Sequence, residues 1–486
     1  MAPTAKRPNI LLLVVDQLRR DWTGFANSGA PARTPNLDLL AARGMVFAQA
    51  FTPSPVCAPA RACLATGLHY DANPVPNNHL DLPVDAQTYY QLLRDKAGYH
   101  VLGAGKFDLH KPTIDFGLDG SYLVEERGFT KAIDNEGKEA APHYGYPTPH
   151  GPYMNYLTEH DMARAIFDDY VARGGRPTPV PPAPPPYESF YEDASPSALA
   201  DHYYFDNWIA RNAANLLTGC PAREPWQLFV SFAGPHPPWD APASVLDGWQ
   251  DVEMPEPFAN SDPEAPVYAA VRRNYAAEIE NLDTRIGELI QLVSDRRELN
   301  DTVIIFTSDH GEMLGDHERW GKSIYWEPSI SIPLVVAGPG VDVGRSDALV
   351  SLEDIAGTIL DYAGLDIPGT MTAQSLRPVL TGSTSHHRDS VVCGLADHGR
   401  NWRALVTPDY KLVFPDTDAD PMLFDRETDP HELNDIANDH PEIVTSLTED
   451  LHAKIGSEWR ATFPALGTAW QEPALPASPD NQIEPQ

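Results

Sequence analysis

Two short apolar segments, each followed directly by polar residues, constrain the fold of this chain more than any other feature. Residues 9–15 (NILLLVV) stop at Asp16–Gln17, and residues 302–307 (TVIIFT) lead into a turn that carries Asp309–His310. Apolar runs of strand length without alternation are typical of strands buried on both faces, as in a parallel sheet. In open α/β sheets the ligand crevice lies beyond the carboxyl ends of the strands. The sequence therefore predicts an α/β fold whose site contains these polar residues.

Two further apolar runs end in the same way. Residues 99–102 lead into a Gly-Ala-Gly turn and Lys106, and residues 228–233 (LFVSFA) lead into Gly234, Pro235 and His236. A lone lysine or histidine in a loop is usually only solvated. Because both follow strands of the same inferred sheet, we expect Lys106 and His236 at the same edge as the acidic residues.

A cysteine-containing helix start supplies a nucleophile candidate. Residues 57–67 (CAPARACLATG) follow a Pro-rich turn, and a proline is tolerated in a first helical turn because its missing N–H has no intrahelical partner there. Cys57 therefore falls at a helix N-terminus, where free N–H groups and the macrodipole favour negative charge. Arg61, one turn on, could hold an oxyanion. The alternative interpretation is an ordinary buried cysteine.

Taken together, these motifs resemble the type I, formylglycine-dependent sulfatases of the alkaline phosphatase superfamily. PNILLLVVDQLRRD, CAPAR followed by TG, GAGK, GPHPP and VIIFTSDHGEMLGDH occur in the order of that family. The resemblance implies that a formylglycine-generating enzyme converts Cys57 to formylglycine. It also implies one divalent cation, calcium or manganese, bound by Asp16, Asp309, His310 and an oxygen of the modified Cys57. The resemblance also counts Gln17 with this ligand set, at a position where many sulfatases have an aspartate. Gln17 together with His310 is more similar to the choline-sulfatase and phosphonate-monoester-hydrolase branch.

The same resemblance implies the catalytic roles. Arg61, Lys106 and Lys322 would surround the sulfuryl oxygens, and His236 would donate to a sulfate or leaving-group oxygen. The family usually has a histidine two residues after the GK lysine, whereas this chain has Asp108 there and His110 two residues later. Either His110 reaches the site as the base or Asp108 does so itself. Aromatic residues near these motifs could recognise a cationic or sugar leaving group, namely Trp239, Trp320, Tyr325 and Trp326.

We therefore expect a sulfuric ester hydrolase with arylsulfatase-type activity on a small sulfate ester. The alternative on the same scaffold is a phosphonate monoester or phosphodiester hydrolase. A non-catalytic binding protein with this fold is a third hypothesis, against which the complete set of site residues argues.

Composition and charge exclude several classes of partner. A formal net charge of −34 over 486 residues argues against nucleic acid, whose phosphates need basic partners. No apolar run approaches the length of a membrane span, and the first apolar run is too short for a signal peptide, so a cytoplasmic location is expected. The four cysteines are scattered and form no disulfide framework. A homo-oligomer is compatible with these data.

The predicted fold class is α/β, with a mixed, mostly parallel central sheet flanked by helices and a smaller C-terminal antiparallel sheet, as in alkaline phosphatase. We expect a catalytic domain over residues 1–385, with a Pro-rich loop excursion at 111–200. A small α+β subdomain is expected at 386–470, with strands at 402–406 and 410–414 followed by a turn segment (MLFDRETDPHELND). Residues 471–486 are predicted to form a C-terminal tail.

Overall fold

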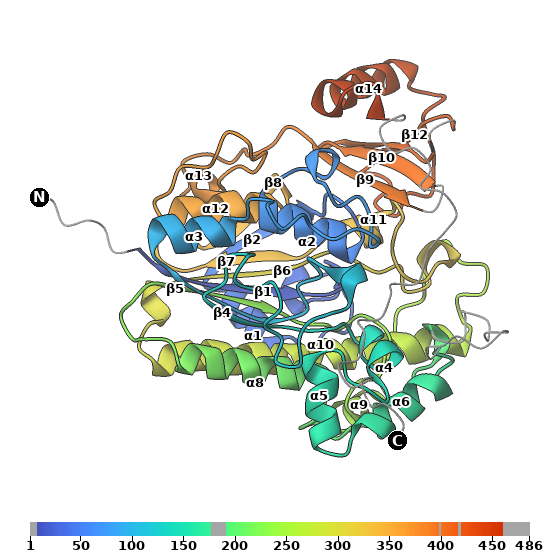
Figure 1. Cartoon of the computed structure of the whole chain (residues 1–486). Coiled ribbons are helices and arrows are strands. Elements are labelled where there is room, and N and C mark those ends of the chain that lie inside the picture. Colours follow the sequence, from blue (N-terminus) through green and yellow to red (C-terminus); the bar gives the residue numbers. More distant parts are fainter. Residues whose placement is uncertain (1–6, 176–190, 398–399, 417–418, 460–486) are drawn as a thin grey trace, which may run out of the picture.

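A mixed eight-stranded sheet forms the centre of the computed structural model, which describes residues 7–175, 191–397, 400–416 and 419–459 (Figure 1). The strand order is β4-β3-β5-β1-β6-β7-β2-β8. Neighbouring strands are parallel, except that β7 runs antiparallel to both β6 and β2. The predicted mixed, mostly parallel sheet is therefore confirmed. The strands are β1 (Asn9–Val15), β2 (Gly44–Phe51), β3 (His100–Gly105), β4 (Lys131–Asp134), β5 (Trp226–Ser231), β6 (Thr302–Ser308), β7 (Leu334–Ala337) and β8 (Gly344–Ser351).

Helices cover both faces of this sheet, which explains why its central strands lack alternation. In Figure 1, α2, α3 and α12 lie on one face and α8 and α10 on the other. Leu11 and Leu13 of β1 pack in the hydrophobic cluster of α8 and α10, whereas Ile10 and Leu12 pack in that of α2, α3 and α12. Both faces of β1 are therefore dry, and every position favours an apolar side chain. The helices are α1 (Pro35–Ala41), α2 (Cys57–Thr66), α3 (Tyr89–Ala97), α4 (Ala140–Gly145), α5 (Pro152–Glu159), α6 (Ala163–Ala172), α8 (Phe205–Thr218), α9 (Ala243–Leu246), α10 (Pro266–Asp295), α11 (Glu327–Ile330), α12 (Asp354–Tyr362), α13 (Arg377–Leu380) and α14 (Pro441–Ile455).

The strand register brings the predicted polar residues together. β1 and β6 pair in parallel with Val15 opposite Ser308, so the next residues, Asp16 and Asp309, leave the sheet side by side. β3 and β5 end with Gly105 opposite Ser231, which places Lys106 and the 233–236 segment at the same edge. The glycines before Lys106 belong to β3, where a loop was expected. Glycine is required at position 105 because a Cβ there would lie 1.9 Å from the Ser231 carbonyl oxygen.

A second, four-stranded antiparallel sheet follows the main one, in the order β12-β11-β10-β9. One face packs on residues of the main body that include Phe51 and Ile330, and the other packs on α14 through Leu447 and Leu451. The predicted C-terminal antiparallel sheet is confirmed. One expectation was wrong: MLFD forms the edge strand β12 rather than a turn, because it pairs with β11. The strands are β9 (Val391–Asp397), β10 (Arg400–Val406), β11 (Tyr410–Phe414) and β12 (Met422–Asp425).

The segment expected to be a loop excursion, residues 111–200, contains regular structure. It contributes β4, the edge strand of the main sheet, and the helices α4, α5 and α6, which lie below the sheet in Figure 1. Its elements are short and separated by proline and glycine, so no long periodic pattern marks them in the sequence. The proline run at 177–186 and the tail at 471–486 lie outside the described residues.

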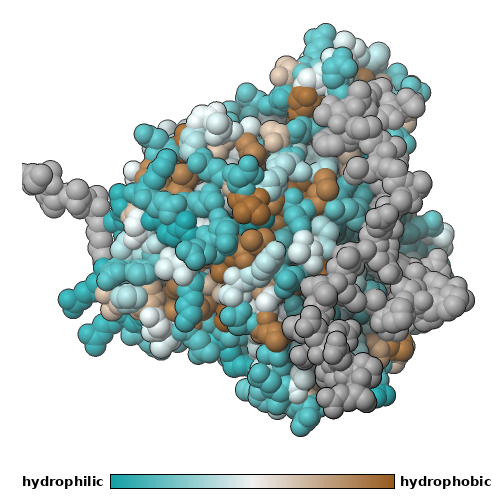
Figure 2. Space-filling model, in the orientation of Figure 1, coloured by the Kyte–Doolittle hydropathy of each residue, from teal (hydrophilic) through white to brown (hydrophobic). Residues whose placement is uncertain are grey.

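The surface agrees with the acidic composition. Hydrophilic residues cover most of the face shown in Figure 2, and hydrophobic residues occur there in small groups between them. Among the described helices, none combines the length and the apolar character that crossing a membrane requires.

Candidate active site

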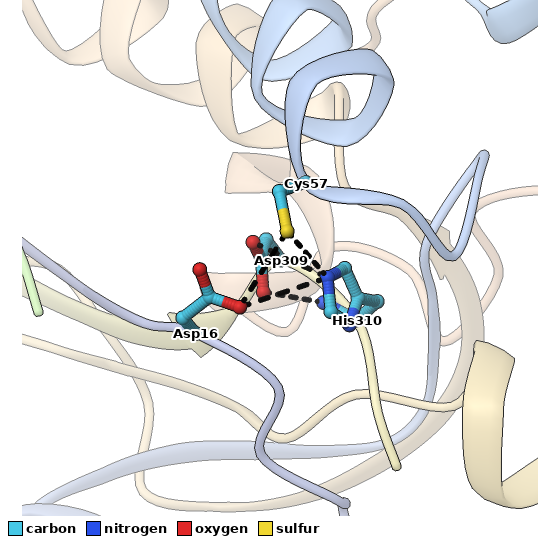
Figure 3. A group of neighbouring side chains, drawn as sticks. All are labelled: Asp16, Cys57, Asp309 and His310. Carbon is cyan, nitrogen blue, oxygen red and sulfur yellow. Dashed lines mark hydrogen bonds and ion pairs between the residues drawn. The ribbon is translucent and has the colours of Figure 1, made fainter. Parts of the chain in front are cut away.

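Four buried side chains converge where the main sheet meets α2. Asp16 follows β1, Asp309 and His310 follow β6, and Cys57 is the first residue of α2. Figure 3 shows the four side chains pointing toward one another, and one potential ligand atom from each lies within 4.8 Å of all the others. All four are at most 1 % exposed. Two carboxylates and an imidazole are a donor set that fits a divalent cation.

Cys57 lies at the N-terminus of α2, as the motif predicts. Val56 caps the helix in an extended conformation, and the thiol is fully buried. Its Sγ is 3.1 Å from Lys322 Nζ, 3.3 Å from His310 Nε2 and 3.7 Å from Lys106 Nζ. Burial raises the pKa of the thiol, but the two ammonium groups outweigh burial and hold it well below its usual range. The position favours an anionic or strongly polarised atom.

Arg61 contacts the carboxylates rather than an open anion site. Its Nε donates to Asp309 Oδ2 at 2.8 Å, and its Nη2 lies 3.1 Å from Asp16 Oδ2. It also donates to the Lys106 carbonyl and to the Ser231 hydroxyl. The guanidinium therefore fixes the orientation of both carboxylates, and it offsets part of their charge.

Lys106 and Lys322 both approach Cys57, and each is held by different partners. Lys106 Nζ forms an ion pair with Asp16 and lies 3.4 Å from Asp108 Oδ2. Lys322 Nζ donates to Gln17 Oε1 and lies 3.9 Å from Asp16 Oδ1. Two cations beside one nucleophile candidate are suited to holding the oxygens of an anionic ester.

Gln17 connects the end of β1 to the loop after β6. It has a positive φ of 72°, and its backbone N–H donates to Asp309 Oδ1 at 3.0 Å. Its amide donates to Glu312 through Nε2 and accepts from Lys322 through Oε1. The structure thus places Gln17 next to the cluster, with its amide oxygen on Lys322. Glu312 also accepts the Leu314 and Gly321 N–H groups. It was not among the residues expected at the site, although it directly follows the DHG motif.

His236 is held in the segment after β5. Asp206 of α8 accepts the N–H groups of Ala233 at 2.7 Å and Gly234 at 3.2 Å, which fixes the start of this segment. His236 Nδ1 lies 2.6 Å from the Pro237 carbonyl oxygen. Since a carbonyl only accepts, Nδ1 carries the proton and Nε2 is the acceptor of the neutral ring. Burial, followed by Lys322, lowers the pKa of His236 to about 4.

Asp108 and His110 occupy different places. Asp108 lines the cavity beside Cys57 and is paired with Lys111 at 2.6 Å. His110 is 2 % exposed, does not line that cavity, and packs on Phe116, with its Nδ1 3.6 Å from Asp134 Oδ2. Burial lowers the pKa of His110 to about 4. The structure brings Asp108 to the site and leaves His110 behind it.

A cavity of about 660 Å³ opens onto Cys57. Its lining combines the charged residues Lys106, Asp108 and Lys322 with a group of rings that we call the aromatic wall, which consists of Phe116, Tyr144, Tyr170, Tyr191 and Trp320. Trp320 is thus the only one of the four aromatic residues singled out in the sequence that lines this cavity among the described residues. Trp239 is buried behind it, and Tyr325 and Trp326 pack toward the small sheet. A larger cavity of about 970 Å³ lies at the opposite, amino ends of the strands, away from these groups.

Comparison with known proteins agrees with this geometry. The family model described as Sulfatase matches residues 8–365, and a model described as N-sulphoglucosamine sulphohydrolase, C-terminal, matches residues 315–459. The chain is 27 % identical to an arylsulfatase of Clostridium perfringens, over 89 % of this chain and 90 % of the relative. It is 30 % identical to a choline-sulfatase of Rhizobium meliloti, over 89 % of this chain and 83 % of the relative. The crystal structure of a phosphonate monoester hydrolase of Agrobacterium radiobacter shares the fold, with a TM-score of 0.74, 24 % identity, and coverage of 94 % and 96 % of the two chains.

Proposed function

This chain belongs to the sulfatase family and hydrolyses sulfate esters, and on that premise we propose that it uses a formylglycine made from Cys57 and one divalent cation. The observation that carries the proposal is the buried cluster of Asp16, Cys57, Asp309 and His310 at the N-terminus of α2. A formylglycine-generating enzyme is the maturation partner that this proposal requires.

The four clustered residues would hold the cation. Their oxygen-rich donor set suits calcium or manganese, and the imidazole of His310 favours manganese. When bound, the cation would acidify the attacking hydroxyl of the modified residue and offset the charge of the ester. Arg61 orients the two carboxylates for this purpose through its bonds to Asp16 and Asp309.

The cations around position 57 would bind the sulfate. Lys106 and Lys322 both lie within 4 Å of Cys57 Sγ, so they are placed to contact oxygens of an ester attacked at that position. His236 is the third group on this side. Because its neutral ring offers Nε2 as an acceptor, we propose that it takes a hydrogen bond from the hydroxyl at position 57. Donation to a sulfate or leaving-group oxygen, the role expected from the family resemblance, needs a second proton on the ring.

Besides His236, the release of sulfate needs a second proton acceptor. The placement of the residues favours Asp108 over His110 for this role. Asp108 lines the cavity, whereas His110 does not. Burial raises the pKa of Asp108, but Lys106 and Lys111 outweigh burial and keep it below its usual range. We propose that this carboxylate accepts the proton that is lost when sulfate departs.

The proposed substrate is a small sulfate ester. A cavity of about 660 Å³ accommodates a sulfate and a compact leaving group, and the acidic surface disfavours long polyanionic chains. Such a small ester would be met in the cytoplasm, the location proposed for this enzyme. A phosphonate monoester is the second candidate substrate. The chain shares its fold with a phosphonate monoester hydrolase, and Gln17, which resembles that branch, bonds Asp309 of the buried cluster.

Two measurements test the proposal together. Mass spectrometry of the peptide that contains Cys57, from protein made with and without a formylglycine-generating enzyme, should show conversion only in the first case. Hydrolysis of 4-nitrophenyl sulfate should rise with the converted fraction, and sulfate should be preferred over phenyl phosphonate in kcat/KM. Full activity of unconverted protein would contradict the proposed nucleophile. A preference for phosphonate over every sulfate would favour the second candidate.

A further inference from the structure

One carboxylate that lines the active-site cavity has no hydrogen-bond or ion-pair partner among the described residues. Two carboxylates line the cavity among the described residues, Asp108 and Glu139. Asp108 is paired with Lys111 at 2.6 Å and lies 3.4 Å from Lys106. No described residue forms a hydrogen bond or an ion pair with the Glu139 carboxylate. A half-buried carboxylate without a partner costs free energy, so its presence in an anion-binding cavity needs an explanation.

The lysines of the cavity do not provide that explanation, because each is engaged elsewhere. Lys322 bonds Gln17 and Cys57, and Lys106 pairs with Asp16. Burial raises the pKa of Glu139. Lys322, Lys111 and Lys106 lower this pKa, but by less than burial raises it. The lysines therefore offset the negative charge of Glu139 only in part, and no described side chain contacts it directly.

The backbone at Glu139 is fixed. The preceding residue, Lys138, is buried and donates to the Pro238 carbonyl at 2.7 Å, and it pairs with Asp240 at 2.7 Å and Glu278 at 3.1 Å. A Cβ at Gly137 would lie 3.1 Å from the Lys106 side chain, so this segment passes directly over Lys106. Glu139 is thus held near the sulfate-binding cations by the buried residues around it.

We propose that Glu139 selects the leaving group of the substrate by forming an ion pair with an ammonium group on it. This inference rests on the proposed function, because it assumes a sulfate ester bound at Cys57. The aromatic wall supports it: Tyr170, Tyr191 and Trp320 line the same cavity, and aromatic rings attract cations. A leaving group with a second negative charge is repelled by Glu139. The substrate class is therefore the monosulfate esters of small, positively charged alcohols or phenols.

A series of four phenyl sulfates tests this selection, with aminoethyl, hydroxyethyl, ethyl or carboxyethyl at the 4-position. These substrates share the sulfate group and have similar leaving-group acidity, but they differ in charge and in hydrogen bonding. In the unsubstituted enzyme, kcat/KM for the aminoethyl ester should exceed that for the ethyl ester by about tenfold or more, and the carboxyethyl ester should be the poorest. Glu139→Gln should reduce the aminoethyl-to-ethyl ratio to within about twofold.

Glu449→Gln is the matched control, because Glu449 is exposed on α14, in the small C-terminal part, and is not among the residues that line the cavity. It should leave all four kcat/KM values unchanged. Equal kcat/KM for the aminoethyl and ethyl esters, or a ratio that survives Glu139→Gln, would overturn the selection. A preference for the hydroxyethyl ester would replace the ion pair with a neutral hydrogen bond and also overturn it. Failure to hydrolyse any of the four would instead overturn the proposed function.

Discussion

The cluster around Cys57 and the aromatic wall face the same cavity but are built in opposite ways. The cluster comes from strand ends and the first turn of α2, and its charges compensate one another: Arg61 and Lys106 both bond Asp16. The aromatic wall comes from α4, α6 and connecting segments, and Glu139 beside it contacts no charged partner among the described residues. On the proposed function, the sheet supplies the catalytic groups, whereas the inserted segments would contact the leaving group.

The most severe way to break the cluster is to remove its nucleophile. Cys57→Ala should lower kcat for 4-nitrophenyl sulfate by more than about 10³-fold, because Cys57 is the one cysteine among the described residues that line the cavity. The melting temperature should change little, since alanine suits a helix start. Cys63→Ala, in the same helix, is the control: Cys63 is fully buried and accepts a bond from Asn73, so its loss should reduce stability more than turnover. Substantial activity of Cys57→Ala would refute the nucleophile.

Removing a ligand should be nearly as damaging. Asp309→Ala should reduce kcat/KM by about 10³-fold, because the cation stabilises charge in the transition state. Metal analysis should find about one divalent ion per chain in the unsubstituted protein and a clear loss in the variant. Chelation followed by addition of calcium or manganese should show which ion restores activity. A metal-free preparation with full activity would exclude the metal site.

Substitution of Asp108 and of His110 tests which of the two residues belongs to the active site. Asp108→Asn should lower kcat by about 10²-fold if the carboxylate accepts a proton in the cavity. His110→Asn should change kcat by less than about tenfold and mainly lower the melting temperature, because His110 packs behind the cavity against Phe116. The reverse order of effects would restore His110 as the base.

Trp320 tests the aromatic wall with a smaller effect. Trp320→Leu should raise KM for 4-nitrophenyl sulfate a few-fold with little change in kcat, because Trp320 lines the cavity and would contact the leaving group rather than the reacting atoms. Trp326→Leu is the matched control, since Trp326 stacks on His317 and packs toward the small sheet. Equal kinetic effects of the two variants would argue against a leaving-group role for the wall.

The smallest expected effect concerns the buried ion pairs that hold Lys138 next to Glu139, where Glu278 contacts Lys138 and Asp240. Burial raises the pKa of Glu278 from 4.5 to about 8. A raised carboxyl pKa contributes stability that is full below about pH 4.5 and is lost as the pH rises through about 8. Glu278→Gln mimics the protonated form, so its free energy of unfolding should fall less than that of the unsubstituted protein between pH 5 and 9, as urea unfolding would measure. Parallel pH profiles would contradict the shifted pKa.

Local sequence patterns were enough to predict the strand ends and the helix start. An apolar run buried on both faces leaves a local pattern, and so does a proline in a first helical turn, so Asp16, Cys57 and Asp309 could be placed from the amino-acid pattern alone. The order of motifs also identified the family. These features are local, and each is readable within about ten residues.

The partners that these residues contact could not be predicted, because they depend on how distant segments pack. The contact between Gln17 and Glu312 joins positions 295 residues apart and depends on the register of β1 and β6. The separation of Asp108 from His110 depends on how the loop after β3 packs, and both residue types are ordinary in loops. Glu139 follows a segment with no periodic pattern, and its lack of a partner among the described residues depends on all the side chains that line the cavity. Such facts arise from packing between distant segments, because burial and charge compensation are set by neighbours in space.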